Sequence, residues 1–399
     1  MTASTAVNID VVIVGGGIAG LWTLARLKQA GYKAVLLEAE ALGAGQTRFA
    51  QGIIHGGTKY ALTGKLSASS EAVADMPALW RNCYKGQGVL DLTQATLLSE
   101  AHYLWSTSSL TSRVSGFFAS KVMRARTSEL AENARPALFR HAGFKGQIYA
   151  LDEPVFDAMS VVRAIAEPVM ASILAIKAGS IKYDNDSLSV QAQDDIHFEF
   201  NFKKIILTAG QGNESLLSAL GLQQPQMQLR PLKMVMLRGG LTDMVFAHCM
   251  GSSVNPRITI TSNRDEQGEV VWYLGGQLAE DGVARSDAEQ IKQAQAELEE
   301  LIPWLDQSKL QWATLDISRA EVKKPGTKRP DTFYVEQQNK VMTAWPTKMA
   351  LAPVMAERIL EMIDDEKLMR VAEAKAELPL WSKPAYATLP WNEASRWSM

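Results

Sequence analysis

Residues 9–38 read IDVVIVGGGIAGLWTLARLKQAGYKAVLLE, and this stretch decides the fold. The apolar run 11–14 predicts a buried strand that leads directly into a Gly-x-Gly-x-x-Gly motif at Gly15, Gly17 and Gly20. In order, these glycines permit a tight turn, a close approach of the backbone to a pyrophosphate, and close packing of the following helix on the sheet. The spacing therefore predicts a dinucleotide-binding βαβ unit.

The rest of the same stretch supplies a helix, a second strand and an acid. Apolar residues recur at helical spacing between Leu21 and Leu27, and Gly31 ends the helix. A second apolar run at 34–37 ends in Glu38, whose carboxylate is placed to accept hydrogen bonds from both hydroxyls of an adenosine ribose. We expect the phosphates over the helix N-terminus, where unpaired N–H groups and the helix dipole favour an anion.

Length, charge and cysteine content narrow the class of protein. At 399 residues the chain is long for one simple core, so we expect two interlocked domains. The net charge of −2 argues against a nucleic-acid binder, which needs a basic face. The cysteines, Cys83 and Cys249, are too few for a disulfide framework and favour a reducing compartment. We assign no metal site.

The N-terminal sequence MTASTAVNID contains no basic residue, and the first apolar run is far shorter than the roughly 20 residues that a membrane span needs. We therefore expect no signal peptide and no transmembrane helix, and we predict a cytoplasmic protein. Peripheral membrane contact stays open, because a surface patch does not show in a linear sequence.

A second loop rich in small and polar residues follows Glu38. It includes GIIHGGTKYAL at 52–62, and a loop in this place can lie along the pyrophosphate and lead the chain beneath an isoalloxazine ring. Here the sequence resembles the FAD-dependent oxidoreductases of the D-amino acid oxidase superfamily. The string itself is most like the corresponding segment of FAD-dependent glycerol-3-phosphate and L-2-hydroxyglutarate dehydrogenases. The resemblance implies FAD as the cofactor and a small-molecule substrate.

Three later segments carry the same resemblance. GQIYALDEPVFD at 146–157 is like the segment that re-enters the cofactor domain, with Asp157 as a helix N-cap. The strand at 204–207 is followed by Thr-Ala-Gly, similar to the second strand of the family that contacts the cofactor. At 345–350 the chain has WPTKMA where the family usually has a glycine-rich turn, which is a departure. Lys348 would offset it by placing a cation near the flavin N1 and O2 atoms, or it is a surface or phosphate-binding lysine.

The expected fold class is α/β: a doubly wound, Rossmann-like FAD-binding domain of the glutathione-reductase type, with a second α+β substrate domain on a mixed or antiparallel sheet. Alternating apolar and polar residues from about 226 to 277 predict that second sheet. The expected boundaries are FAD domain 1–80, 145–222 and 330–365; substrate domain 81–144 and 223–329; C-terminal strap 366–399.

The resemblance and the βαβ unit together imply a set of residues in contact with FAD. They lie in the first glycine-rich turn, at the end of the second strand, in the second loop, after the strand at 204–207 and in the turn at 345–350. Because this last turn departs from the family pattern, we call it the departing turn. They are Gly15, Gly17, Ile18, Ala19, Gly20, Glu38, Ala39, Thr47, Arg48, Gln51, Gly52, Ile53, Ala209, Gly210, Pro346, Thr347, Lys348 and Met349.

His55 is the candidate for accepting the substrate proton, because imidazole titrates near working pH and the loop is expected beneath the flavin. Two other interpretations stay open. In the related dimethylglycine dehydrogenases a histidine at the analogous place is bonded covalently to the flavin, and a loop histidine is also often simply packed against backbone.

An anionic substrate needs a cation, and arginine offers a planar fork for two parallel hydrogen bonds. The candidates are Arg319 or Arg329, with Arg230 and Arg257 behind them. Arg230, His248 and Tyr273 lie on the predicted second sheet, which in the resembled family forms the roof and wall of the substrate pocket. Each of these is also a reasonable structural strand residue.

The C-terminal tail ends in LPLWSKPAYATLPWNEASRWSM, with three tryptophans among three prolines. Such rings expose much apolar area if they are solvated, so we interpret the tail as a strap packed over the domain. An interface for a partner protein or a membrane is the alternative.

Together these patterns predict an FAD-dependent oxidoreductase, a dehydrogenase or oxidase. Its substrate would be a small anionic hydroxy acid, polyol phosphate or amino acid, which loses a hydride to flavin N5. The electron acceptor would be oxygen, a quinone or a carrier protein. Two alternatives are a flavin monooxygenase, including one that modifies a partner protein, and a non-catalytic flavoprotein with structural FAD.

Overall fold

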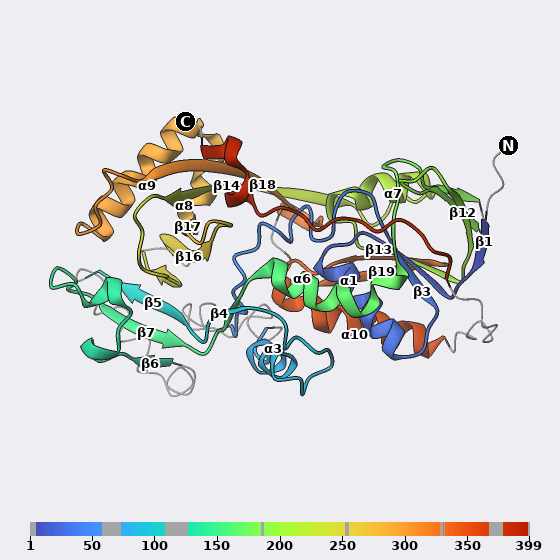
Figure 1. Ribbon diagram of the computed structural model, residues 1–399, viewed down its shortest axis with the longest axis horizontal. Helices are drawn as coiled ribbons and strands as arrows, with labels where there is room; N and C mark the ends of the chain where they lie inside the picture. The colour runs from blue at the N-terminus through green and yellow to red at the C-terminus, as the bar shows by residue number, and fades with distance from the viewer. Residues whose placement is uncertain are drawn as a thin grey trace.

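The computed structural model describes residues 5–57, 73–107, 127–184, 187–251, 255–327, 330, 332–366 and 378–397. Two parts lie side by side along the long axis of the molecule (Figure 1). One is built on a six-stranded sheet and the other on an eight-stranded sheet. The predicted fold class, an α/β FAD-binding fold with a second sheet-based domain, is confirmed.

The six-stranded sheet has the order β19-β20-β13-β2-β3-β9. Its neighbours pair in parallel except β19 with β20. Every residue of β2, β3 and β13 is buried, as expected for a parallel sheet covered on both faces. The strands are β2 Val11–Val14, β3 Ala34–Glu38, β9 Ile173–Ala175, β13 Lys204–Leu207, β19 Tyr334–Gln338 and β20 Val341–Trp345.

Alternate residues of β2 point to the two covering layers. Val11 and Ile13 pack with the helices α1 Ile18–Gln29, α6 Ala158–Ala166 and α10 Ala352–Asp365. Val12 and Val14 pack instead with a four-stranded sheet of order β1-β12-β11-β10. Figure 1 shows the three helices together on one side of β13 and β19. The strands of the small sheet are β1 Thr5–Asn8, β10 Lys182–Asp184, β11 Ser187–Gln191 and β12 His197–Asn201.

The eight-stranded sheet has the order β18-β14-β17-β16-β15-β5-β7-β6, and its neighbours are antiparallel except β15 with β5. The helices α8 Gln277–Asp281 and α9 Asp287–Leu301 accompany it, and Ser286 and Glu289 form a capping box at the start of α9. The strands are β5 His102–Ser106, β6 Thr127–Glu129, β7 Gln147–Leu151, β14 Met227–Arg238, β15 Ala247–Cys249, β16 Ile258–Arg264, β17 Val270–Gly275 and β18 Gln311–Val322.

Two long strands connect the parts. β14 and β18 pair along their full length and reach from one part to the other along the top of the view (Figure 1). At the far end of β18, Ala320 and Val322 pack with Trp345 of β20. The backbone N–H of Ala320 donates to Gln46 of the second loop. The eight-stranded sheet is therefore anchored directly on β20 and on the second loop.

The remaining elements are short. A two-stranded sheet joins β4 Leu97–Ser99 to β8 Val155–Phe156, and Asp157 caps α6 as predicted by accepting from the Ser160 N–H at 2.5 Å. The others are α3 Met76–Tyr84, α7 Asn213–Ala219 and the 3-10 helices η3 Glu132–Ala134, η4 Ala137–Arg140, η5 Glu167–Ser172, η6 Gly210–Gly212, η7 Gly282–Ala284, η8 Pro325–Thr327, η9 Met349–Leu351, η10 Pro390–Asn392 and η11 Ala394–Trp397. Within the described ranges, no helix is both long and apolar enough to cross a bilayer.

The C-terminal residues 378–397 run across both parts (Figure 1). Trp381 packs edge-on against Phe198 of the small sheet, with ring centroids 5.7 Å apart. Further along, Trp391 lies 5.9 Å from Tyr273 of β17, and Trp397 lies over the Arg238 guanidinium. We infer that this segment is a strap that ties the small four-stranded sheet to the eight-stranded sheet.

Replacing one of the buried tryptophans tests the strap. Trp391 is 2% exposed, so Trp391→Ala should lower the free energy of unfolding by about 3–5 kcal/mol. The control is Leu380→Ala in the same segment, because Leu380 is 99% exposed and its truncation should change stability by no more than about 0.5 kcal/mol. Chemical denaturation measures both. Unchanged stability and solubility after deletion of 379–399 would contradict the strap.

Candidate active site

The glycine-rich turn after β2 is shaped by two close backbone contacts. Gly15 has a φ of 110°, and a Cβ there would lie 2.7 Å from the Ala209 backbone. A Cβ on Gly20 would lie 2.0 Å from the Gly15 carbonyl oxygen. A Cβ on Gly17 would meet only the Thr47 hydroxyl, at 3.2 Å. Gly15 and Gly20 are therefore required by the fold, whereas Gly17 leaves an open cradle at the α1 N-terminus, which suits a pyrophosphate.

Glu38 closes the cradle at the end of β3. Its carboxylate accepts from the Gly16 N–H at 2.5 Å and from the Glu40 N–H at 2.7 Å. Burial raises the pKa of Glu38, and these two N–H groups oppose that effect only in part. Beside it, Ala39 is partly buried against the core, and Thr47 accepts from the Ile18 N–H at 3.1 Å. The acid is thus held beside the first turn of α1, where an adenosine ribose is expected.

The second loop passes between the two sheets. Gln51 donates to Thr261 of β16 at 3.2 Å and to the Tyr273 carbonyl at 3.3 Å. Gly52 has a φ of 72°, and a Cβ there would lie 1.9 Å from the Phe156 carbonyl. Ile53 pairs with Val155. The loop is therefore fixed against the substrate-side sheet.

Arg48 departs from our expectation. Its guanidinium donates to the Thr388 carbonyl at 2.9 Å and pairs with Glu393 at 2.6 Å. It also lies over the Phe49 ring. The side chain is therefore committed to the C-terminal strap, and the predicted contact of this side chain with FAD is not supported. The spacing of residues along the loop gave no sign that the tail would return to it.

Two further predicted segments meet just beyond the C-terminal end of β13. The Ala209 N–H donates to Asn213 at 2.7 Å, and the Gly210 carbonyl accepts from the Trp345 indole at 3.0 Å. These bonds hold the Thr-Ala-Gly turn against the start of the departing turn. The two turns lie close together because they follow β13 and β20, which are neighbours in the sheet.

The departing turn keeps a glycine-like backbone without a glycine. The Lys348 N–H donates to the Pro346 carbonyl at 2.6 Å, so the chain makes a three-residue turn around Thr347. Thr347 has a φ of 57°, a region that non-glycine residues occupy at some cost. Its hydroxyl donates to the Thr332 carbonyl. Met349 then begins η9, which leads directly into α10.

His55 belongs to a buried cluster that the sequence did not reveal. Its Nδ1 lies 3.1 Å from Glu153, which also accepts from the Gly56 N–H at 2.9 Å. The His248 ring stacks on His55 at 5.9 Å with an interplanar angle of 14°, and His102 lies 4.1 Å from His248 between ring centroids. Within the described residues, no group of histidine, cysteine and acidic side chains is arranged to hold a metal ion.

The Glu153 carboxyl group is 1% exposed. Burial works against ionisation. The hydrogen bond from His55, the charges of His55 and His102 and the Gly56 N–H together outweigh it and hold the pKa of Glu153 below its ordinary value. Sequence analysis missed Glu153 and His102. The only local signal was a pair of acids, Asp152 and Glu153, among the apolar residues of ALDEPVF.

Of the predicted pocket residues on the second sheet, His248 stacks on His55, whereas Tyr273 and Arg257 have other partners. Tyr273 is 0% exposed, and its hydroxyl donates to the Phe49 carbonyl at 3.3 Å. Burial raises its pKa. This burial gives no support to the predicted site role of Tyr273. Arg257 is also excluded as an anion clamp, because it is paired with Glu297 and Glu300 of α9.

The remaining arginine candidates lie at the β14–β18 pair. Arg319 is directly opposite Arg230 and donates to its carbonyl at 3.4 Å. Arg230 itself forms an ion pair with Glu321 at 2.9 Å. Arg319 stays a candidate, and Arg329 lies outside the described residues.

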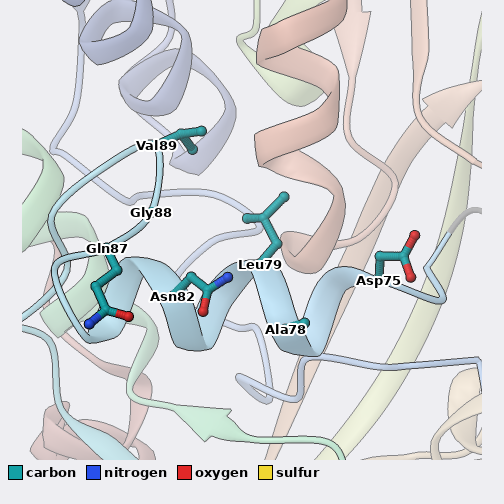
Figure 2. A pocket seen from close by; sticks show the side chains of 7 residues that line it. All are labelled: Asp75, Ala78, Leu79, Asn82, Gln87, Gly88 and Val89. Carbon is teal, nitrogen blue, oxygen red and sulfur yellow. The ribbon is translucent and has the colours of Figure 1, made fainter.

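A separate hollow of about 640 Å³ lies over α3 (Figure 2). Part of its lining comes from α3 and part from the loop that follows. The lining residues are Asp75, Ala78, Leu79, Asn82, Gln87, Gly88 and Val89. Asp75 is the one ionisable group among these, so the hollow lacks the paired groups that proton transfer needs.

The family DAO, described as FAD dependent oxidoreductase, matches residues 10–345. A probable FAD-dependent oxidoreductase from Pseudomonas aeruginosa is 45% identical over 390 residues, which cover 98% of this chain and 99% of the relative. The chain belongs to the DAO family of FAD-dependent oxidoreductases. The predicted superfamily and FAD as the cofactor are confirmed.

Solved structures agree with this DAO-family assignment. The crystal structure of the FAD dependent oxidoreductase from Pseudomonas aeruginosa has a TM-score of 0.83 at 40% identity and covers 98% of this chain and 99% of its own. Glycine oxidase from Geobacillus kaustophilus has 0.65 at 12%, covering 94% and 100%. L-alpha-glycerophosphate oxidase from Mycoplasma pneumoniae has 0.62 at 13%, covering 95% and 98%. The last two show likeness of fold alone.

The glycine contacts predict two different outcomes in this DAO-family protein. Gly17→Ala should leave the fold intact but weaken FAD binding by roughly tenfold or more, because its methyl group would enter the pyrophosphate cradle. Gly20→Ala should prevent folding, because its Cβ has no room beside the Gly15 carbonyl. Flavin content after purification and circular dichroism distinguish the two. Equal FAD retention in Gly17→Ala and the parent chain would contradict the cradle.

Proposed function

We propose that this DAO-family enzyme oxidises a small anionic hydroxy acid, polyol phosphate or amino acid, and that the bound FAD supplies the hydride acceptor at N5. The observation that carries the proposal is the 3.1 Å contact between His55 Nδ1 and the buried carboxyl group of Glu153. A neutral imidazole oriented by a carboxylate is suited to take a proton from a substrate O–H or N–H. The substrate C–H bond then breaks with its electron pair leaving as hydride.

His55 is the member of its cluster that retains solvent exposure. Its side chain is 17% exposed, whereas His102 and His248 are 0% and 2% exposed. A group that exchanges protons with a substrate must reach it, so we assign this role to His55. Glycine oxidase and L-alpha-glycerophosphate oxidase, whose folds resemble this one, are named for an amino acid and a polyol phosphate, which supports the proposed substrate class.

The proposal is tested by adding a panel of hydroxy acids, amino acids and polyol phosphates to the enzyme without oxygen. The visible band of the oxidised flavin should be lost with one class of compound. Bleaching by NAD(P)H alone would indicate a monooxygenase instead. If no compound bleaches the band, the FAD is structural. Oxygen or a quinone is then added to the reduced enzyme, and the compound that restores the oxidised flavin band is identified as the electron acceptor.

Replacing His55 tests its role directly. His55→Asn should lower kcat by about 10²- to 10⁴-fold, because the proton acceptor is removed, while FAD content stays the same. His197→Asn on β12 is the matched control and should retain full activity. An unchanged kcat in His55→Asn would exclude it as the base. Acid precipitation of the parent enzyme should leave a colourless pellet, whereas a yellow pellet would show a covalent link.

Lys348 is proposed to stabilise negative charge on the flavin, since it stands at the start of η9 in the departing turn. Lys348→Met should lower the flavin midpoint potential by about 30 mV, which for a two-electron couple corresponds to about 1.4 kcal/mol. Lys177→Met is the control, because Lys177 pairs with Asp195 on the surface. Spectroelectrochemistry measures both variants, and an unchanged potential in Lys348→Met would remove the proposed role.

A further inference from the structure

Glu153 faces His55 because two distant segments pair through their backbones. The Phe156 N–H donates to the Gly52 carbonyl at 3.0 Å, and the Ile54 N–H donates to the Pro154 carbonyl at 2.9 Å. The next bond in this series runs from the Gly56 N–H to the Glu153 side chain instead of to a carbonyl. The backbone register therefore sets the carboxylate beside the His55 ring.

Both oxygens of Glu153 are used. One accepts from the Gly56 N–H and the other lies 3.1 Å from His55 Nδ1. A carboxylate accepts hydrogen bonds, as Glu153 does from the Gly56 N–H, so we assign the proton of this contact to Nδ1. In the neutral ring the lone pair is then on Nε2.

A second group restricts the face of the His55 ring. His248 stacks on it nearly in parallel, and His248 is itself held by a 2.8 Å contact between its Nδ1 and the Thr259 hydroxyl. The His102 ring is tilted against His248, with ring centroids 4.1 Å apart. The ring is thus held at one edge by Glu153 and over one face by His248.

Burial of such a carboxylate is costly and is a weak source of stability, even when it is paired. Its placement is better explained by what it does to His55. We propose that Glu153 is a positioning residue that fixes the tautomer and orientation of His55, so that Nε2 is the basic atom presented to the substrate. This inference rests on the proposed function of His55.

The kinetic test uses the FAD-loaded enzyme and the compound that bleaches the flavin. Glu153→Gln should lower kcat by about 10- to 100-fold with little change in KM, because the base is misoriented while the substrate still binds. The acid limb of the pH profile should move to lower pH, since the negative charge beside His55 is gone, although His248 and His102 remain near it. Glu153→Asp keeps the charge and should recover part of the rate.

Asp10→Asn is the matched control. Asp10 is also 1% exposed, and it also accepts from one side chain, Lys203, and one backbone N–H, that of Lys33. It stands at the start of β2, and its replacement should reduce stability without moving kcat or the pH profile. If Glu153→Gln behaves like Asp10→Asn in all these measurements, Glu153 is structural and the inference is overturned.

A measurement without turnover separates this inference from the proposed function. Nitrogen-15 NMR of histidine-labelled enzyme should show the Nδ1–H tautomer for the signal that disappears in His55→Asn. In Glu153→Gln that signal should change, and in Asp10→Asn it should not. If this holds while no compound bleaches the flavin, only the proposed function fails. If a substrate is found but neither the tautomer nor kcat depends on Glu153, only the positioning role fails.

Discussion

The close contact between Gly20 and the Gly15 carbonyl is the constraint on which the rest of the structure depends. It seats α1 on the end of β2 with its N-terminus turned toward the cofactor site. Thr208 of the neighbouring turn donates its hydroxyl toward the Val14 and Gly15 carbonyls, at 3.0 and 3.2 Å. The ends of β2 and β13 are therefore joined at the place where the helix begins.

The same turn organises what lies around it. Glu38 reaches it through the Gly16 N–H, and Thr47 caps the first turn of α1 from the second loop. From there the loop continues to Gly52. Only glycine fits at this position, because the Phe156 carbonyl oxygen lies where a Cβ atom would be. The cofactor cradle and the His55 cluster are thus consecutive parts of one chain path, so the position of the base relative to the cofactor is set by backbone contacts.

The second sheet and the C-terminal strap complete this arrangement from outside. β18 is anchored at Gln46, and the strap neutralises Arg48 through Glu393. Both contacts act on the second loop, between the cradle and His55. The loop that carries the proposed base His55 is therefore supported from two sides by segments far away in sequence, which suits a site that requires orientation.

Much of the fold was predictable from the sequence because its signals are local. The turn, helix and acid at 9–38 follow from backbone geometry at glycine and from helical spacing, and Asp157 was recognisable as a cap. The partners of the base were not predictable. Glu153 is 98 residues from His55, and nothing in the sequence indicated that Tyr273 is buried or that Arg48 pairs with Glu393.

The sequence by itself determined the dinucleotide unit, the family and the identity of the candidate base. The dinucleotide unit depends on residues within about thirty positions of one another, where bond geometry and periodicity act directly. The family and the candidate base came from the resemblance of several such local segments to known oxidoreductases. Only the tertiary structure decided which carboxylate holds His55, which arginines are already neutralised, and that a threonine occupies a glycine-like turn at Thr347. These features depend on the register between strands that are distant in the chain, and no local pattern records that register.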